Sequence, residues 1–169
     1  MFDNTQRIIA NCFSLASASF LAYSTFSKKK EKMLIYQSFD VFFCFLADVF
    51  VGSYSAAVTC IINLARNMLA AKNKLKIWMS VVCVILTIVL GVLCNQIGFV
   101  GWLPIFASVE YTFAINVTKN ANEMRYALIL NLILWLMHDL YVGLCPNAIM
   151  DCVIVVFSVF NIIRLKKID

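Results

Sequence analysis

The feature that most constrains this chain is a succession of apolar stretches, each close to the length needed to cross a bilayer. A membrane-spanning helix requires about 20 mostly apolar residues. Seven stretches approach this length, at residues 8–26, 33–51, 54–71, 77–93, 102–117, 126–142 and 147–164. In a chain of 169 residues they leave no room for a separate soluble domain. We therefore predict an all-α membrane protein with seven transmembrane helices.

The composition supports this prediction. Hydrophobic residues make up 63% of the chain and charged residues only 14%, whereas a soluble domain carries about a quarter charged residues. This balance excludes a soluble globule, a disordered chain and a nucleic-acid-binding protein. The lipid bilayer is the one partner that the composition requires, and we expect no nucleic-acid partner.

Lysine and arginine are concentrated in alternate connections between the apolar stretches. They cluster at 28–32, 72–76, 119–125 and 164–167, and of the 14 basic residues only Arg7 and Arg66 lie elsewhere. Cytoplasmic loops carry an excess of basic residues, so we predict the N-terminus outside and the C-terminus in the cytoplasm. The first basic cluster follows the first apolar core, whereas a signal peptide has its charge before the core, so we expect this span to be retained.

Two short patterns occur twice in the chain and indicate an internal repeat. Residues 48–52 read DVFVG and residues 139–143 read DLYVG, while Asn63-x-x-Arg66 recurs as Asn161-x-x-Arg164. The patterns keep the same order and equivalent expected depths in the membrane. We predict two three-helix bundles, residues 8–71 and 102–164, joined by a linker helix at 77–93. An odd linker helix gives both bundles the same orientation, as in SWEET-type sugar exporters.

Several of these residues also carry a family resemblance. The segment from Trp135 to Gly143, which contains His138 and Asp139, and the later Asn161-x-x-Arg164 pattern together resemble the bacterial inner-membrane YgjV family. Residues 55–66 resemble the first-half counterpart of that pattern. The resemblance covers the chain from the second span to the C-terminus and implies a location in the bacterial inner membrane.

The predicted architecture is also similar to that of SWEET, PQ-loop and PnuC-type transporters, which carry sugars, amino acids or vitamin precursors. The chain departs from the PQ-loop pattern, because Pro104 precedes Ile and Pro146 precedes Asn. It also lacks the aromatic-rich substrate motif expected of a PnuC-type protein. The similarity to transporters is therefore one of fold and not of site residues.

Ionisable and polar residues inside the spans are the candidate functional residues. A charge at the bilayer centre costs about 2.5–3.5 kcal/mol and usually faces the bundle interior. Asp40 and Glu110 are the deepest acids, and each is either a substrate or proton-coupling carboxylate or part of a structural contact. The amides of Asn63 and Asn161 either bind a polar solute or fasten helices together.

Six further residues have a functional and a structural interpretation each. Trp135 stacks on a ring-shaped solute or packs in the core, and His138 relays protons or bonds to a neighbouring helix. We expect no contact between His138 and Asp139, because adjacent helical residues point about 100° apart. The other candidates are assigned to a gate or to ion pairs: Asp48, Asp139, Arg66 and Asp151.

Each of these four has its own expected environment. Asp48 and Asp139 lie near the outer ends of equivalent helices, where they form a gate or reach water. Arg66 lies deep enough to need a carboxylate partner. Asp151 lies in the first turns of the last helix, where the helix dipole favours a negative charge.

The sequence predicts neither an enzyme, a metal site nor a cofactor. It contains no Walker loop, no G-x-S-x-G and no H-E-x-x-H pattern. There is a single histidine and no C-x-x-C pair, so we interpret the cysteines as packing residues and expect no zinc site. The chain has seven of them: Cys12, Cys44, Cys60, Cys83, Cys94, Cys145 and Cys152.

We therefore predict a small-solute transporter, facilitative or proton-coupled, and expect a polar solute and protons as its partners. Alternating access would come from rocking one bundle against the other. The alternative is a non-transporting subunit of a larger membrane complex, and an intramembrane enzyme is a third and weaker hypothesis. The sequence leaves open whether the chain forms a homo-oligomer.

Overall fold

The computed structural model describes the backbone of residues 3–165 and the side chains of residues 3–120 and 122–159. This part of the chain is helical throughout, with no strand. Its elements are α1 (Asn4–Thr25), α2 (Lys30–Phe50), α3 (Tyr54–Ala71), α4 (Ile77–Leu93), the short 3-10 helix η1 (Gly98–Gly101), α5 (Trp102–Val117), α6 (Ala121–Val142) and α7 (Cys145–Leu165). The all-helical fold predicted from the sequence is confirmed for the described residues.

Among the residues that the structure describes, three segments are long and apolar enough to cross a membrane by themselves. They are α1, α2 and the continuous segment Gly98–Val117, which joins η1 to α5. Two more apolar helices are shorter, namely α4 and the Cys145–Val159 part of α7. A membrane protein is thus supported directly, while a membrane crossing by every helix stays a prediction.

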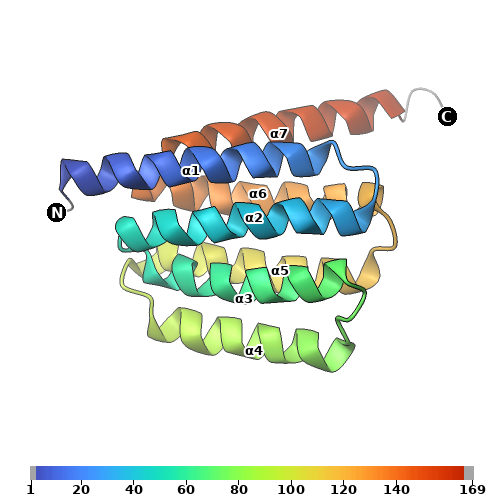
Figure 1. Ribbon diagram of the computed structural model, residues 1–169, viewed down its shortest axis with the longest axis horizontal. Coiled ribbons are helices and arrows are strands. Elements are labelled where there is room, and N and C mark those ends of the chain that lie inside the picture. The colour runs from blue at the N-terminus through green and yellow to red at the C-terminus, as the bar shows by residue number, and fades with distance from the viewer. Residues whose placement is uncertain (1–2, 166–169) are drawn as a thin grey trace.

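The helices run alternately in opposite directions and form two facing rows (Figure 1). One row contains α1, α2 and α3 with α2 in the middle, and the other contains α7, α6 and α5 with α6 in the middle. Across the rows, α1 contacts α7, α2 contacts α6, and α3 contacts α5. Helix α4 lies at one edge, where it packs against α3 and α5.

Helix α4 shows the distribution of side chains expected of a lipid-facing helix. Large apolar residues such as Trp78 and Ile85 are exposed, whereas its buried residues are the small Ser80, Thr87 and Gly91. A Cβ atom at Gly91 would lie only 2.7 Å from Cγ1 of Ile105 in α5. Small residues allow membrane helices to approach closely, which is how α4 is held against the rest of the bundle.

More than half of the buried apolar residues belong to two separate clusters. The larger one includes Leu21, Met33, Ile115 and Met124 and occupies the end of the bundle where α1 turns into α2. The smaller one consists of Ala10, Ala47, Val51 and Leu144 and lies at the opposite end. The middle of the bundle, between the two clusters, is where polar side chains gather.

Helices α2 and α6 end in the same way. Gly52 and Gly143 both adopt left-handed backbone conformations, with φ of 65° and 83°. The amide of Ser53 donates to the carbonyl oxygen of Asp48 at 2.9 Å, and the amide of Leu144 donates to that of Asp139 at 2.9 Å. This bond between positions five apart is the mark of a glycine-terminated helix. The recurring DVFVG and DLYVG patterns therefore have one shared structural role.

At the other end of the bundle, the basic residues that begin α2 and α6 cap helices of the opposite row. Lys30 Nζ donates to the carbonyl oxygens of Ile115 and Thr118 at the end of α5, at 2.7 and 2.6 Å. Arg125 Nη2 donates to those of Thr25 and Ser27 at the end of α1, at 2.9 and 3.0 Å. A cation at a helix C-terminus satisfies its free carbonyl groups and complements the helix dipole. Each row thus supplies a cap to the other.

Candidate functional site

A polar cavity of about 50 Å³ lies between the two rows of helices. Every α-helix except α4 contributes to its wall. The ionisable groups that line it include three carboxyl groups and one guanidinium, from Asp40, Asp139, Asp151 and Arg66. Amide side chains complete most of the polar lining: Gln37, Asn63, Asn67, Asn131 and Asn147. The cavity therefore brings charged and amide side chains of α2, α3, α6 and α7 together inside the bundle.

Helical spacing explains how the chain brings these groups together. Residues three or four positions apart lie on one face of a helix. Asn131, Trp135 and Asp139 follow this spacing on α6, as do Asn147 and Asp151 on α7. The polar stripes of successive helices therefore converge on the space between the rows.

Three of the predicted solute-binding residues lie together at this cavity, namely Asp40, Asn63 and Trp135. Oδ1 of Asp40 accepts a hydrogen bond from Oγ of Ser17 in α1 at 2.6 Å. Oδ1 of Asn63 accepts one from Oγ of Ser108 in α5 at 2.5 Å. Asn63 therefore fastens α3 to α5 and also lines the cavity, so the hydrogen bond between the helices is confirmed and solute binding stays a prediction.

One predicted solute-binding residue, Glu110, does not line the cavity. Glu110 is absent from the lining and is partly exposed, and its Oε2 has no hydrogen-bond partner in the described part of the chain. Glu110 therefore does not share the cavity with Asp40, and its functional role stays a prediction. Asn161 and Arg164 belong to α7, but their side chains lie outside the described residues.

Arg66 is buried as predicted, but its partners are neutral. Its Nε and Nη2 atoms both donate to Oδ1 of Asn67, at 3.2 and 2.9 Å. Its Nη1 atom donates to two oxygens of α5, Oγ1 of Thr112 at 2.7 Å and the carbonyl oxygen of Ser108 at 3.1 Å. It also lies over the ring of Tyr111, 5.4 Å from its centroid. No carboxylate of the described residues pairs with it, so the expected ion pair is wrong.

His138 and Asp139 make direct contact, which corrects the expectation that neighbouring helical residues do not meet. Nδ1 of His138 lies 2.8 Å from Oδ1 of Asp139, and both residues are buried. Nε2 of His138 lies 2.8 Å from Oγ of Ser53, at the turn between α2 and α3. The ring of Trp135 stands edge-on to His138, with centroids 5.5 Å apart. A hydrogen-bonded chain thus runs from the turn at Ser53 to the cavity at Asp139.

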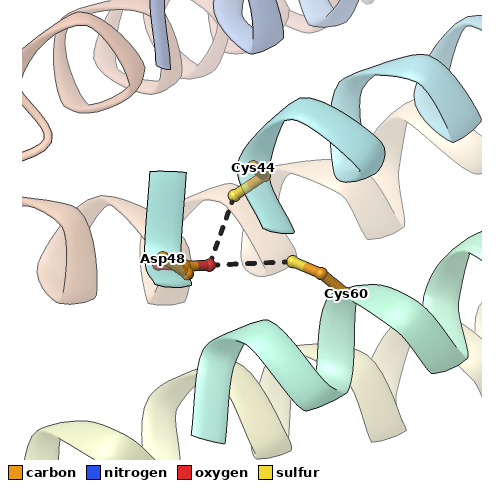
Figure 2. A group of neighbouring side chains, drawn as sticks. All are labelled: Cys44, Asp48 and Cys60. Carbon is orange, nitrogen blue, oxygen red and sulfur yellow. Dashed lines mark hydrogen bonds between the residues drawn. The ribbon is translucent and has the colours of Figure 1, made fainter. Parts of the chain in front are cut away.

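Asp48 and Asp151 are both buried, so the alternative in which Asp48 reaches water at a helix end does not hold. Oδ2 of Asp48 accepts hydrogen bonds from the thiols of Cys44 at 3.6 Å and Cys60 at 3.8 Å (Figure 2). These two cysteines are therefore more than packing residues. Asp151 lies near the start of α7 but faces the cavity, so the helix dipole does not account for its position.

Several amides of the lining were not among the predicted site residues. The Tyr111 hydroxyl donates to Oε1 of Gln37 at 3.0 Å, and Nδ2 of Asn131 donates to the carbonyl oxygen of Ala107 at 2.8 Å. Nε2 of Gln37 and Oδ1 of Asn147 have no partner among the described residues. The signal that could have found these amides is their spacing from the acids, because Gln37 precedes Asp40 by one helical turn and Asn147 precedes Asp151 by one turn.

Comparison with known proteins places the chain in one family. The family model Imp-YgjV, described as bacterial inner membrane protein, matches residues 8–168. The comparison with curated proteins and the comparison with solved structures give no match. The match covers nearly the whole chain and confirms the resemblance seen in the sequence. The chain therefore belongs to the Imp-YgjV family of bacterial inner membrane proteins.

Proposed function

We propose that this protein transports a small polar solute across the inner membrane, either facilitatively or coupled to protons. The observation that carries the proposal is the polar cavity at the interface of the two rows. Ionisable groups within a membrane are costly, and they usually mark a substrate or ion pathway. Here Asp40, Arg66, Asp139 and Asp151 come from four helices and line the same cavity.

The conformation described above corresponds, in this proposal, to an occluded state. One apolar cluster lies at each end of the bundle, where it narrows the passage for a solute and leaves the cavity accessible to ions and water. The cavity volume of about 50 Å³ leaves room for a few water molecules, since each needs about 10–15 Å³. A solute the size of an amino acid or sugar enters only when the rows separate, which is the movement that alternating access requires.

The arrangement of the helices supports the proposed internal repeat. In the proposed repeat, α1, α2 and α3 correspond to α5, α6 and α7. The contact between α1 and α7 then has its counterpart in the contact between α5 and α3, and both contacts are present. The same correspondence relates the caps made by Lys30 and Arg125. It also relates the glycine-terminated ends of α2 and α6. In this proposal α4 is the linker, and the end that carries Lys30 and Arg125 faces the cytoplasm.

The chemistry of the lining favours a solute with both a positive group and hydrogen-bonding groups. Three carboxyl groups face the cavity, against one guanidinium whose partners are neutral. The unpartnered polar atoms of Gln37 and Asn147 supply one donor and one acceptor to the same space. An amine-bearing solute such as an amino acid meets these requirements better than a neutral sugar does.

For proton coupling, we propose a route along the hydrogen bonds that lead from Ser53 through His138 to Asp139. A neutral imidazole donates through one nitrogen and accepts through the other, so it can pass a proton between its two partners. Both nitrogens of His138 are engaged, one towards each partner. Ser53 lies at the end of the bundle proposed to face outside, and Asp139 lies at the cavity.

A ligand screen on the detergent-purified protein tests the proposal. The thermal midpoint is measured with panels of amino acids, amines, sugars, nucleosides and organic acids at two pH values. A solute at 100 times its Kd should stabilise the protein by about 2.7 kcal/mol. We expect a shift that Asn63→Ala abolishes and that Asn4→Ala, an exposed amide at the start of α1, leaves intact.

Transport itself is then measured with the stabilising solute in proteoliposomes. We expect uptake that Asp40→Asn reduces at least tenfold. A complete absence of stabilisation and of uptake across the panels would count against transport. It would favour the alternative, a subunit of a larger membrane complex, and co-purification from the native membrane would then identify the partner.

A further inference from the structure

We infer that Cys44, Asp48 and Cys60 form a binding site for Zn²⁺ or another soft divalent cation. Cys44 and Asp48 lie one turn apart on α2, and Cys60 faces them from α3 (Figure 2). One ligand atom from each of the three residues lies within 4.8 Å of the other two. All three side chains are buried, so the site lies inside the bundle and not on its surface.

The spacing of these atoms fits tetrahedral coordination. Zn–S bonds of about 2.3 Å and Zn–O bonds of about 2.0 Å, at tetrahedral angles, put sulfur and oxygen ligands about 3.5 Å apart. The Sγ atoms of Cys44 and Cys60 lie 3.6 and 3.8 Å from Oδ2 of Asp48. The two Sγ atoms lie within 4.8 Å of one another, against about 3.8 Å in a tetrahedral site, so side-chain movements of at most about 1 Å would bring all three ligand atoms onto one ion.

A second observation points to a ligand at this place. Oδ1 of Asp48 is buried without a hydrogen-bond partner among the described residues, which is costly for a carboxylate. A cation beside Asp48 would compensate that cost. In addition, Nδ2 of Asn147 lies 3.8 Å from Sγ of Cys44, where it can donate to a thiolate and support a ligand from outside the coordination shell.

The donor set decides the class of cation. Thiolates select Zn²⁺ and related soft ions such as Cd²⁺, whereas Mg²⁺ and Ca²⁺ prefer oxygen ligands. Three protein ligands leave the fourth position open, which is typical of sites where the bound species exchanges. Cys44 and Cys60 also line the polar cavity, which gives the ion a route to the site.

Binding exchanges protons for the metal. Each thiol must lose its proton to bind as a thiolate, so one divalent ion releases two protons to solvent through the cavity. The inference concerns equilibrium binding by three side chains and holds whether or not the protein transports a solute.

The test uses reduced, detergent-purified full-length protein in which the exposed Cys12, Cys145 and Cys152 are replaced by serine. Titration with Cd²⁺ is followed by the thiolate-to-metal charge-transfer absorption and by proton release into a weakly buffered solution. We expect one equivalent bound and about two protons released per ion. Cys44→Ser and Cys60→Ser should each weaken binding at least 100-fold, and Asp48→Asn at least tenfold. The matched control Cys94→Ser should leave binding unchanged.

Unchanged Cd²⁺ binding in the Cys44→Ser and Cys60→Ser variants would overturn the inference. A second measurement needs no change at the site, in case those variants fail to fold. The same protein is alkylated with and without Cd²⁺, under brief detergent unfolding that is just sufficient to make every cysteine of the metal-free sample reactive. Alkylation of each cysteine is then quantified by mass spectrometry. Protection of Cys44 and Cys60 but not of Cys94 supports the site, and equal alkylation of all of them overturns it.

Discussion

His138 lies 2.8 Å from Asp139, its own neighbour in the chain, although both residues belong to one helix. The 100° between adjacent positions separates their Cα–Cβ bonds, but both side chains are long enough to turn towards each other. The contact leaves Nε2 of His138 free to meet Ser53 in the opposite row. A single histidine therefore joins a carboxyl group at the cavity to the end of the bundle.

This pair should be strongly coupled. His138→Ala leaves Asp139 buried without its partner, and we expect a loss of about 3–5 kcal/mol in unfolding free energy, because one member of a buried pair remains. The double variant His138→Ala/Asp139→Ala should lose less than the sum of the two single variants. Reversible unfolding in mixed micelles measures all four proteins, and strictly additive losses would contradict the coupling.

Arg66 should not tolerate lysine. An ammonium cannot reproduce the guanidinium contacts to Asn67, Thr112 and the carbonyl oxygen of Ser108, or the stacking on Tyr111. We expect Arg66→Lys to reduce unfolding free energy by about 2–3 kcal/mol. The control is Arg7→Lys, at an exposed position of α1, which should change it by less than about 0.5 kcal/mol. Equal effects of the two substitutions would show that the network around Arg66 adds nothing.

Gly91 should be required for the packing of α4. An alanine Cβ would meet the side chain of Ile105 at 2.7 Å, and overpacking of this kind costs about 1–3 kcal/mol. We expect Gly91→Ala to lower the thermal midpoint and Ile105→Ala to restore part of the loss in the double variant. The control Val92→Ala, on the exposed side of α4, should have little effect.

Gly143 should be required for its backbone conformation alone. Its φ is 83°, and nothing lies within 4 Å of an added Cβ, so Gly143→Ala should cost about 1–2 kcal/mol through strain and not through collision. Asparagine tolerates this conformation better, so Gly143→Asn should lose less. Thermal unfolding distinguishes the two, and an equal loss in both variants would assign the effect to something other than φ.

The two cross-row caps should contribute similar amounts. Lys30→Met and Arg125→Met each remove a cation that donates to two carbonyl oxygens, and we expect each to cost about 1–2 kcal/mol. Lys28→Met, at an exposed position of the α1–α2 turn, is the matched control. A large loss in one variant and none in the other would contradict the equivalence of the halves.

Hydropathy was sufficient to predict most of the fold. The bounds of α3, α4 and α5 coincide with the predicted ones, since apolar residues fill those helices to their ends. Helix α6 begins earlier than predicted, at Ala121, because its first turn is polar. That turn is stabilised by Asn120, which accepts from the amide of Glu123, and by Glu123, which accepts from the amide of Lys119. This reciprocal capping is readable in a sequence but has no hydropathy signal.

The sequence indicates how far along its helix each candidate residue lies, but not towards which neighbouring helices its side chain points. The sequence predicts Asp40 and Glu110 to be the two deepest acids, yet Asp40 lines the cavity and Glu110 does not. Tyr111, one position further along α5, does line the cavity, so a rotation of about 100° separates a lining residue from its neighbour. Which face of α5 points inward depends on how α3, α4 and α6 surround it, and that packing is a tertiary property.

The reciprocal caps also bear on how the protein is made. The free carbonyl groups at the end of α1 receive their donor from Arg125, which the ribosome adds about 100 residues later. Those at the end of α5 receive theirs from Lys30, which is by then already in place. The end of α1 therefore has no donor from Arg125 until α6 has been synthesised, whereas the donor for the end of α5 is present as soon as α5 has been synthesised. Capping of α1 therefore requires that the two halves of the bundle pack together. In a chain that ends before α6, the carbonyl groups at the end of α1 lack this donor.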